Sequence, residues 1–343
     1  MQALVIEKPG ELVLREVDTP RPGPDDLLIQ VQACGICGSD VHGYDGSTGR
    51  RIPPLIMGHE AAGVVTATGA AVGGFAVGDR VTFDSTISCG TCGYCARGEV
   101  NLCDRRQVLG VSCGDYRRHG AFAEYVVVPQ HIAYKLPENF SFERAALIEA
   151  VSVAVHAAKL TPIVQGDTVL VIGAGMIGLL AMQAFRHFGC RRVFAVDLEA
   201  DRLQQARAMG ADATFQAQDP VLAEALQAAA GPGGIDIAVD AVGNQSSVAA
   251  AIAHVRRGGT VTLIGNLAPK VELPLQAVVT RQLRLQGSCA SAGEYPECIR
   301  LMESGAIQVD SLISAVAPLA EGAQWFARLA ARERGLMKVI LRP

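Results

Sequence analysis

The segment VLVIGAGMIG at residues 169–178 sets three glycines in the G-x-G-x-x-G spacing, between an apolar run and a run of helix-forming residues. This arrangement predicts a buried strand, a tight turn and a helix, in that order. Gly173 permits the turn, Gly175 lets the backbone approach a pyrophosphate, and Gly178 lets helix and strand pack closely. Asp197 ends the next apolar run, where a carboxylate can accept hydrogen bonds from an adenosine ribose. The pattern predicts a dinucleotide-binding domain; glycines that serve packing alone are the simpler alternative.

The charge of Asp197 bears on which dinucleotide binds. A carboxylate at this position repels a 2′-phosphate, so the sequence favours NAD over NADP. Met176 and Ile177, inside the glycine turn, join the predicted cofactor-binding residues. Arg202 follows on the next predicted helix, where it either stacks on the adenine or is a solvated helix charge.

The pattern of apolar residues along the chain changes near residue 145. Residues 1–150 hold short alternating runs separated by Gly- and Pro-rich segments, which is typical of an antiparallel sandwich or distorted barrel. Residues 151–289 alternate apolar strand runs with helical runs, which predicts a doubly wound parallel sheet. The closing segment KVILRP can add a last strand to the first domain, so we assign residues 290–343 to that domain. The predicted fold class is α/β with an additional β-rich domain.

Composition and charge exclude several classes of protein. Hydrophobic residues make up 50% of the chain and charged residues 19%, which suits large buried cores. The net charge of −4 and the pI near 6.0 offer no basic field for nucleic acid or an anionic membrane. The longest apolar run is broken by glycines, and the N-terminal residues lack the pattern of a signal peptide. We therefore expect a cytoplasmic protein without nucleic-acid or membrane partners.

Four of the ten cysteines lie within the segment CGTCGYCARGEVNLC. In a reducing compartment, cysteines this dense bind metal more often than they form disulfides. Their spacing suits a tetrahedral all-thiolate zinc site, and four ligands leave no position for a substrate. We therefore predict a structural zinc, with an iron–sulfur cluster or an empty reduced site as alternatives. Its ligands would be Cys89, Cys92, Cys95 and Cys103.

A second set of possible ligands is scattered along the first domain. The segment ACGICGSDVHGYDG contains Cys37, and IMGHEAAGVV contains His59 followed by Glu60. Glu149 lies far downstream, in ALIEAVSVAVHA. One thiolate, one imidazole and one carboxylate make a three-ligand zinc site with an open position, which a catalytic zinc requires. Each residue also has a simpler interpretation as a core or surface side chain, and sequence separation alone does not unite them.

These motifs together resemble one known family. GICGSDVH, GHEAAGVV, the four-cysteine segment, LIEAVSVAVHA and VLVIGAGMIGLLA occur in this order over essentially the whole chain. In this combination the chain resembles the zinc-dependent medium-chain dehydrogenase/reductase family of the alcohol dehydrogenase superfamily. CGSDVH and LIE are similar to its sorbitol and polyol dehydrogenase branch. The resemblance implies a GroES-like catalytic domain holding two zinc ions, a Rossmann domain holding NAD, and an active site in the cleft between them.

The resemblance also implies ligands for the catalytic zinc. Cys37 and His59 would bind the ion, and Glu60 and Glu149 are both candidates for the remaining coordination. Lys338 stands where relatives carry a basic partner for the glutamate after the zinc-binding histidine, which predicts a pair between Lys338 and Glu60.

A proton path and further cofactor contacts follow from the same resemblance. A zinc ion lowers the cost of deprotonating the alcohol, so Cys37 and His59 count as catalytic residues. Ser39 would take the proton and pass it through the cofactor ribose to His42, for which a surface-loop histidine is the alternative. Asp40 would orient His59. By analogy the nicotinamide end would be held around Val242, Ile264, Gly265 and Cys289.

Some positions depart from the sorbitol-type pattern. Ala290 and Ser291 stand where that branch often has an arginine and an aromatic residue, which weakens any inference of sorbitol itself. Arg50 and Arg51 precede the GHE motif. They either bind a carboxylate or phosphate of the substrate or are solvated loop charges.

The predicted function is that of an NAD-dependent zinc oxidoreductase. It transfers a hydride from a secondary hydroxyl of a polyol, sugar acid or related alcohol to NAD⁺, and back. A sugar-phosphate dehydrogenase and a simple secondary-alcohol dehydrogenase are the alternatives. A zinc-free reductase would lack Cys37 and His59, and the negative net charge opposes a thiol-redox or nucleic-acid-binding module. Because the family runs to dimers and tetramers, we expect a homo-oligomer, first a homotetramer, with the apolar segment 271–279 at an interface.

Overall fold

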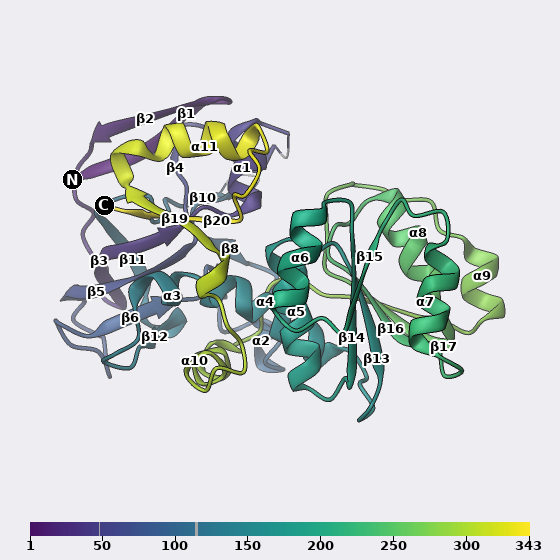
Figure 1. The fold of residues 1–343 in the computed structure, drawn as a ribbon. Helices are drawn as coiled ribbons and strands as arrows, with labels where there is room; N and C mark the ends of the chain where they lie inside the picture. The colour runs from purple at the N-terminus through teal and green to yellow at the C-terminus, as the bar shows by residue number, and fades with distance from the viewer. Residues whose placement is uncertain (48, 114–115) are drawn as a thin grey trace. The chain divides into compact units, whose positions relative to one another are not determined.

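The computed structural model describes residues 1–47, 49–113 and 116–343 and divides into two compact units (Figure 1). The first, which we call the β unit, consists of Met1–Glu149, Tyr295–Glu303 and Val309–Pro343. The second, which we call the α/β unit, consists of Ala150–Glu294 and Ser304–Gln308. The short return of the chain at residues 304–308 was not anticipated from the sequence, because it carries no motif of its own.

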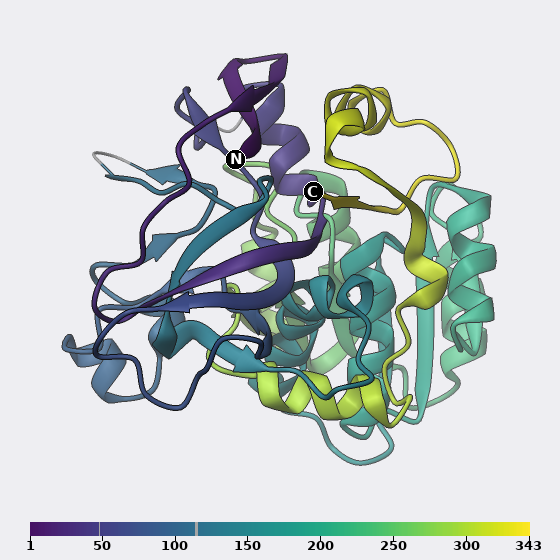
Figure 2. The same ribbon diagram turned by 90° about the vertical axis from the view of Figure 1, so that its left-hand side faces the viewer.

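The β unit is built around one mixed sheet. In sheet order its strands are β12 (Ala133–Lys135), β6 (Arg80–Phe83), β5 (Glu60–Thr68), β3 (Asp26–Gly35), β20 (Lys338–Arg342) and β19 (Ile313–Pro318), with β11 (Tyr125–Pro129) also paired to β3. Strand β3 is central, and its antiparallel pairing with β20 joins segments that are far apart in the sequence (Figure 2). The segment KVILRP thus forms a strand of the first unit, as predicted.

Smaller elements surround this sheet. The strands are β2 (Glu11–Glu16), β1 (Gln2–Lys8) and β4 (Leu55–Ile56) in one sheet, β7 (Thr86–Ile87) with β8 (Gln107–Val108), and β9 (Ser112–Cys113) with β10 (Tyr116–Arg117). The helices are α1 (Gly38–Tyr44), α2 (Gly93–Ala96), α3 (Phe142–Ala146), α10 (Tyr295–Glu303) and α11 (Gly322–Ala330). The 3₁₀ turns are η1 (Val100–Leu102), η2 (Gln130–Ile132), η3 (Asp310–Leu312) and η4 (Leu319–Glu321). Helix α4 (Ile148–Leu160) begins in this unit and continues into the α/β unit.

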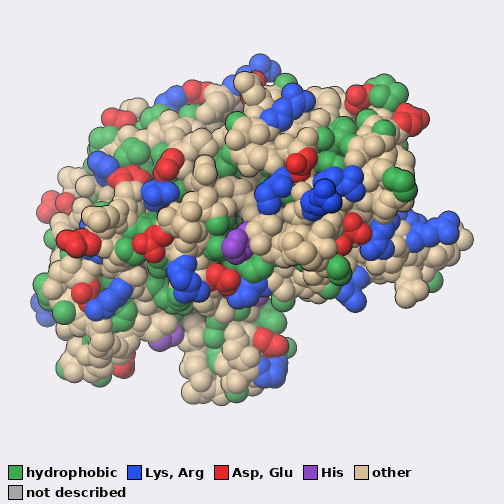
Figure 3. All heavy atoms as spheres, turned by 60° about the horizontal axis from the view of Figure 1, so that its bottom comes forward, with side chains coloured by type: hydrophobic (Ala, Val, Ile, Leu, Met, Phe, Trp, Pro, Cys, Tyr) green, Lys and Arg blue, Asp and Glu red, His purple; other side chains and the backbone are tan. Residues whose placement is uncertain are grey.

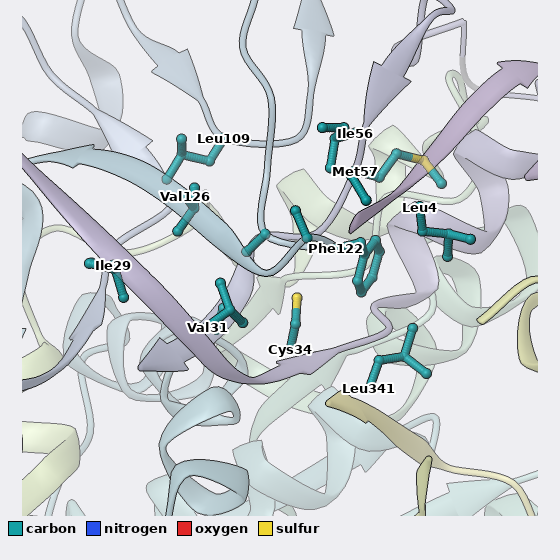
Figure 4. Packing of buried hydrophobic residues seen from close by; sticks show 14 of the residues in the cluster. Leu4, Ile29, Val31, Cys34, Ile56, Met57, Leu109, Phe122, Val126 and Leu341 are labelled. Carbon is teal, nitrogen blue, oxygen red and sulfur yellow. The ribbon is translucent and has the colours of Figure 1, made fainter. Parts of the chain in front are cut away.

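Alternation along the strands creates the core of the β unit. Ile29 and Val31 of β3 belong to the same buried cluster as Leu4 of β1, Phe122 and Leu341 of β20 (Figure 4). Cys34 lies in the same apolar cluster and is fully buried. Burial raises the pKa of the Cys34 thiol well above its usual range, which keeps it uncharged. Cys34 is therefore a core side chain.

The α/β unit holds a parallel sheet. In sheet order its strands are β15 (Ala213–Gln216), β14 (Arg192–Asp197), β13 (Thr168–Ile172), β16 (Ile235–Asp240), β17 (Val255–Leu263) and β18 (Arg284–Gly287). Numbered along the chain, this is the order 3-2-1-4-5-6 of doubly wound sheets. The helices are α5 (Met176–His187), α6 (Ala200–Ala208), α7 (Leu222–Ala230), α8 (Gln245–His254) and α9 (Leu275–Thr280). Helices α5 and α6 cover one face and α7 and α8 the other (Figure 1).

No helix within the described part of the chain is long and apolar enough to cross a membrane. On the face drawn in Figure 3, Lys and Arg side chains are interspersed with Asp and Glu side chains. This mixture agrees with the small net charge of −4.

Candidate active site and metal centres

Strand register assembles the first cluster of possible metal ligands. Cys37 caps the N-terminus of α1, just after β3 ends at Gly35, and His59 directly precedes β5. Gly35 lies opposite Glu60, the first residue of β5. A Cβ on Gly35 would come within 2.4 Å of Glu60 Oε2, so the absence of a side chain at position 35 leaves room for the Glu60 carboxylate. The ligand atoms of Cys37, His59 and Glu60 therefore all lie within 4.8 Å of one another.

The chemistry of this cluster fits a zinc ion. It offers one thiolate, one imidazole and one carboxylate, a set that leaves one position of a tetrahedral ion open. His59 and Glu60 are buried and Cys37 is partly buried. Ligand atoms of these three kinds, gathered this closely, suit a divalent metal.

Asp40 contacts two of these ligands from the first turn of α1. Its Oδ2 accepts a hydrogen bond from the backbone N–H of Cys37 at 3.3 Å, and its Oδ1 lies 3.3 Å from Nδ1 of His59. The second contact is at ion-pair distance but outside hydrogen-bond geometry. Burial would lower the pKa of His59, but Asp40 and Cys37 outweigh it and raise this pKa well above its ordinary range. The arrangement turns Nε2 of His59 away from Asp40, as the resemblance implies.

A buried ion pair holds Glu60. Lys338, the first residue of β20, places Nζ 2.5 Å from Oε2 of Glu60 and 3.0 Å from the carbonyl oxygen of Ile36. Burial opposes the charge on Lys338, but the attraction of Glu60 raises its pKa above the ordinary value. The predicted pair between Glu60 and Lys338 is confirmed.

Glu149 lies at the start of α4, close enough to interact electrostatically with His59 and Glu60. Burial and repulsion from Glu60 and Asp84 raise the pKa of its carboxyl to about 7, against the attraction of His59. Among the described residues, the group able to hold a metal includes Glu60 but does not extend to Glu149. The geometry therefore favours Glu60 as the third ligand, with Glu149 as a partly buried carboxyl outside the group.

The two residues of the predicted proton path lie on α1. Ser39 Oγ is 3.4 Å from Nε2 of His59, on the ring edge that faces the ligand cluster. The side chain of His42 is 40% exposed, and its Nδ1 lies 3.8 Å from Oδ2 of Asp45. Ser39 therefore adjoins the metal ligands, whereas His42 reaches solvent.

The four-cysteine segment forms a second group of possible ligands, around α2. Sγ of Cys95 lies 3.5 Å from Sγ of Cys92 and 3.9 Å from Sγ of Cys89. Sulfurs bound tetrahedrally at Zn–S distances of about 2.3 Å would be about 3.8 Å apart. Backbone N–H groups of Cys89 and Arg105 donate to Sγ of Cys103 at 3.2 and 3.3 Å.

The ionisation of these thiols indicates that a cation belongs among them. Hydrogen bonds from Thr91 lower the pKa of Cys89 to about 5, and those from the backbone lower the pKa of Cys92. Burial and the neighbouring sulfurs raise the pKa of Cys95 to about 11. Sulfurs this close cannot all become negative unless a cation balances them. The group therefore fits a zinc ion with every coordination position filled by protein.

The glycine turn joins β13 to α5 in the α/β unit. Gly173 has φ +94°, which favours glycine, and a Cβ on Gly178 would lie 1.7 Å from the carbonyl oxygen of Gly173. Gly175 is the N-cap of α5, and the nearest atom to a Cβ placed there, Nη1 of Arg202, is 4.0 Å away. The turn thus leaves open space in front of a helix N-terminus, as a pyrophosphate requires.

Asp197 ends β14 beside this turn. Its Oδ2 accepts from the backbone N–H of Ala174 at 2.6 Å, and its Oδ1 accepts from that of Glu199 at 2.9 Å. Nη1 of Arg202 lies 3.9 Å from Oδ2. These contacts fix the carboxylate at the carboxyl end of the strand, where a ribose can approach it.

The other predicted cofactor residues lie at the same edge of the sheet. Val242 follows β16, Ile264 and Gly265 follow β17, and Cys289 follows β18. Parallel strands end at one edge, so these residues share that edge with the glycine turn, where doubly wound sheets bind ligands. Met176 and Ile177 form the first turn of α5.

Comparisons with known proteins agree with this geometry. Residues 23–138 match the model of the alcohol dehydrogenase GroES-like domain, and residues 177–304 match that of the zinc-binding dehydrogenase family. Sorbitol dehydrogenase of Bacillus subtilis is 35% identical over 92% of this chain and 89% of its own length. D-xylulose reductase A of Aspergillus oryzae is 36% identical over 88% of this chain and 85% of its own. The chain belongs to the zinc-binding alcohol dehydrogenase family.

A solved structure supports the assignment to this dehydrogenase family across the whole chain. The zinc-binding dehydrogenase of Sinorhizobium meliloti 1021, solved bound to NADP, superposes with a TM-score of 0.90 at 35% identity. It covers 100% of this chain and 99% of that chain. The predicted family and the predicted fold, a GroES-like domain with a Rossmann coenzyme domain, are confirmed. The protein is an oxidoreductase of the zinc-dependent alcohol dehydrogenase type.

Arg51 of this dehydrogenase was expected either to bind an anionic substrate or to be a solvated loop charge, and its surroundings fit neither role. The side chain of Arg51 is only 4% exposed, and its Nη2 donates to Oδ1 of Asp40 at 3.0 Å. Arg51 is therefore neither a solvated loop charge nor available to an anionic substrate. No sequence signal could have shown this, because the contact depends on how the loop after α1 folds back. Arg50 beside it is exposed.

A second pair was also missed. Nδ1 of His156, on α4, lies 2.8 Å from Oε1 of Glu294, and both side chains are buried. Burial opposes ionisation of Glu294, but His156 outweighs it and lowers the pKa of the carboxyl. The pair ties α4 to the loop after β18 within the α/β unit of the dehydrogenase. Its two members are far apart in sequence, so only the fold could reveal it.

Proposed function

We propose that this dehydrogenase oxidises a secondary hydroxyl of a polyol or closely related alcohol, transferring a hydride to NAD⁺, and catalyses the reverse reduction. The observation that carries the proposal is the set Cys37, His59 and Glu60, which offers three zinc ligands and leaves a position for substrate. The relatives named for sorbitol and xylulose support a polyol rather than a simple alcohol.

The residues around this set would prepare it for one metal ion. Zinc bound there would lower the cost of forming an alkoxide from the substrate hydroxyl. Asp40 keeps Nε2 of His59 directed toward Cys37, and Lys338 keeps the Glu60 carboxylate at the cluster. The protein thus holds its ligands in place before metal and substrate arrive.

Ser39 and His42 are the proposed proton carriers. Ser39 Oγ lies beside the ligand edge of His59, close to where a substrate hydroxyl would stand. His42 is exposed enough to exchange the proton with water. The step through the cofactor ribose remains part of the proposal.

A second zinc ion is proposed at Cys89, Cys92, Cys95 and Cys103, giving two ions per chain. Because protein ligands would fill every position, this ion would hold the loop around α2 and take no part in the chemistry.

We propose NAD rather than NADP as the cofactor, with Asp197 as the deciding residue. Its carboxylate stands at the ribose end of the predicted site and would repel a 2′-phosphate. The relative from S. meliloti was solved with NADP, so both cofactors need testing. In Asp197→Ala, the ratio of kcat/KM for NADP⁺ to that for NAD⁺ should rise by about tenfold or more, the effect of removing roughly 1.4 kcal/mol of repulsion. An unchanged ratio would contradict the role of Asp197.

The substrate class is tested by NADH production from polyols, aldonates, sugar phosphates and secondary alcohols. Arg51 is committed to Asp40, which weakens the case for an anionic substrate. We therefore expect the highest kcat/KM for an uncharged polyol. A protein with two zinc ions per chain that oxidises none of these alcohols would overturn the proposed function, and a preference for a sugar phosphate would redirect it.

Assembly and location complete the proposal. The segment 271–279 exposes Val271, Leu273, Leu275 and Val279, an apolar group that suits contact with a second copy of the chain. We propose a homo-oligomer, first a tetramer, to be checked by light scattering. Nine cysteines, Cys34, Cys37, Cys89, Cys92, Cys95, Cys103, Cys190, Cys289 and Cys298, are free thiols, which suits the reducing cytoplasm.

A further inference from the structure

Arg51 is buried beside the proposed catalytic metal site. It follows α1 in the loop that leads to β4, and its side chain is 4% exposed. Its guanidinium donates through Nη2 to Oδ1 of Asp40 at 3.0 Å and to Oγ of Ser39 at 3.4 Å, and through Nη1 to the carbonyl oxygen of Arg50 at 3.3 Å. Burying an arginine is costly unless it is paired, so a role in this site is expected.

Asp40 links this arginine to two metal ligands. The oxygen that accepts from Arg51, Oδ1, is also the one 3.3 Å from Nδ1 of His59. The other oxygen accepts the backbone N–H of Cys37. One buried carboxylate therefore joins Arg51 to both neighbouring ligands.

The charges show what Arg51 contributes. A histidine that binds zinc must be neutral, so His59 as a ligand cannot balance the charge of Asp40. Among the described residues, the ion-pair partners of Asp40 are His59 and Arg51. A guanidinium keeps its charge at any working pH, so Arg51 is the lasting counter-ion of this carboxylate.

Packing gives an independent sign that the site is shaped around the arginine. Gly43 of α1 is buried, and a Cβ added there would lie 2.3 Å from Cγ of Arg51. The atom in the way is near the base of the side chain rather than at its mobile end. Even an alanine at position 43 would therefore displace Arg51.

We propose that Arg51 is a positioning residue of the catalytic zinc site. It keeps the charged Asp40 carboxylate beside Nδ1 of His59, and its contact with Ser39 stabilises the serine oxygen that carries the proton. The inference rests on the proposed function, because it assumes zinc at Cys37, His59 and Glu60. In this proposal Arg51 supports the zinc ligands and the proton path, and it does not bind the substrate.

The first test measures zinc retention rather than turnover. Purified full-length protein is dialysed against a chelator, and zinc per chain is followed with time. Replacing a residue that supports a metal ligand weakens metal binding by roughly 10- to 100-fold. We therefore expect Arg51→Met to lose one of two zinc ions that much faster than wild type, while the ion of the four-cysteine loop stays bound. Arg328→Met, which removes an exposed ion pair with Glu333 in the same unit, is the matched control and should retain both ions.

Two further variants separate positioning from general stability. Arg51→Lys keeps the charge but lacks the planar fork, so zinc loss should be intermediate. Gly43→Ala removes no charged group but displaces the Arg51 side chain, so it should lose zinc as Arg51→Met does. With excess zinc restored, Arg51→Met should show a lower kcat and an unchanged KM for the alcohol, because substrate binding does not use Arg51.

Each outcome decides between the alternatives. A folded Arg51→Met that retains zinc as wild type does would overturn the inference. If Arg51→Met fails to fold, wild-type zinc retention in both Arg51→Lys and Gly43→Ala would overturn it as well. A wild-type protein with no zinc at the site of Cys37 would instead refute the proposed function, so the two failures are distinguishable.

Discussion

The two groups of possible metal ligands in this dehydrogenase are built in opposite ways. The four-cysteine loop takes all its possible ligands from one short segment, in which Cys89, Cys92 and Cys95 are partly exposed and Cys103 is buried. The set Cys37, His59 and Glu60 comes from the ends of β3 and β5, and other side chains support each buried ligand. A local site can be complete with its ligands alone. A site that must keep one position open needs Asp40, Arg51 and Lys338 to hold the ligands that it does have.

The largest expected difference between the two centres is in turnover. Cys37→Ser removes a ligand of the open site and should lower kcat by about 1,000-fold or more, since the metal provides several kcal/mol of transition-state stabilisation. The fold should survive, as circular dichroism and thermal unfolding would show. If Cys37→Ser kept its catalytic zinc and its kcat, chemistry would have to be assigned elsewhere.

Cys92→Ser tests the opposite centre. Losing a zinc ion that is present at 1,000 times its Kd costs about 4 kcal/mol of unfolding free energy. We expect that loss in denaturant titrations, with kcat per folded chain close to wild type. An equal loss of intrinsic turnover in Cys37→Ser and Cys92→Ser would abolish the division of roles.

Buried charge should make the open site sensitive to alkali when metal is removed. The pKa of Glu149 is raised from 4.5 to about 7 by burial and by its acidic neighbours. The folded chain thus holds this proton more tightly than the unfolded chain, and stability falls as pH rises from about 4.5 to about 7. In chelated protein, Glu149→Gln should gain about 3 kcal/mol at pH 8 and little at pH 4. A gain that did not depend on pH would point to packing instead.

Asp40 should show the reverse dependence. Burial opposes its charge, but His59 and Arg51 lower the pKa of the carboxyl from 3.8 to about 2. Its stabilisation is complete above pH 4 and is lost as pH falls toward 2, which amounts to about 2 kcal/mol. Chelated Asp40→Asn should lack this component of acid unfolding. Glu333→Gln, which removes an exposed carboxylate, is the control; an acid profile in Asp40→Asn identical to wild type would contradict the assignment.

The same contrast explains how far the sequence could lead. The four cysteines and the glycine turn are local patterns. Residue spacing alone therefore predicted a metal site for the cysteines and a strand, turn and helix for the glycines. Only the resemblance to a known family predicted that Cys37 and His59 lie together. They are brought together by the pairing of Gly35 with Glu60, a contact between distant strands that sequence spacing does not reveal. Arg51 was misjudged for a related reason. Arg51 is buried because its loop folds onto α1 at Gly43, which leaves room for the arginine side chain. From the sequence alone, a charged residue in a polar loop is expected to be solvated.

The pairing of β20 with β3 has a consequence for the newly made protein. Glu60 receives its counter-ion from Lys338, 278 residues further along the chain. A polypeptide that is still being synthesised has all four cysteines of the loop long before it has that lysine. The loop can therefore take up zinc early during translation. The set Cys37, His59 and Glu60 lacks the lysine that holds Glu60 until β20 has been made and has joined the sheet.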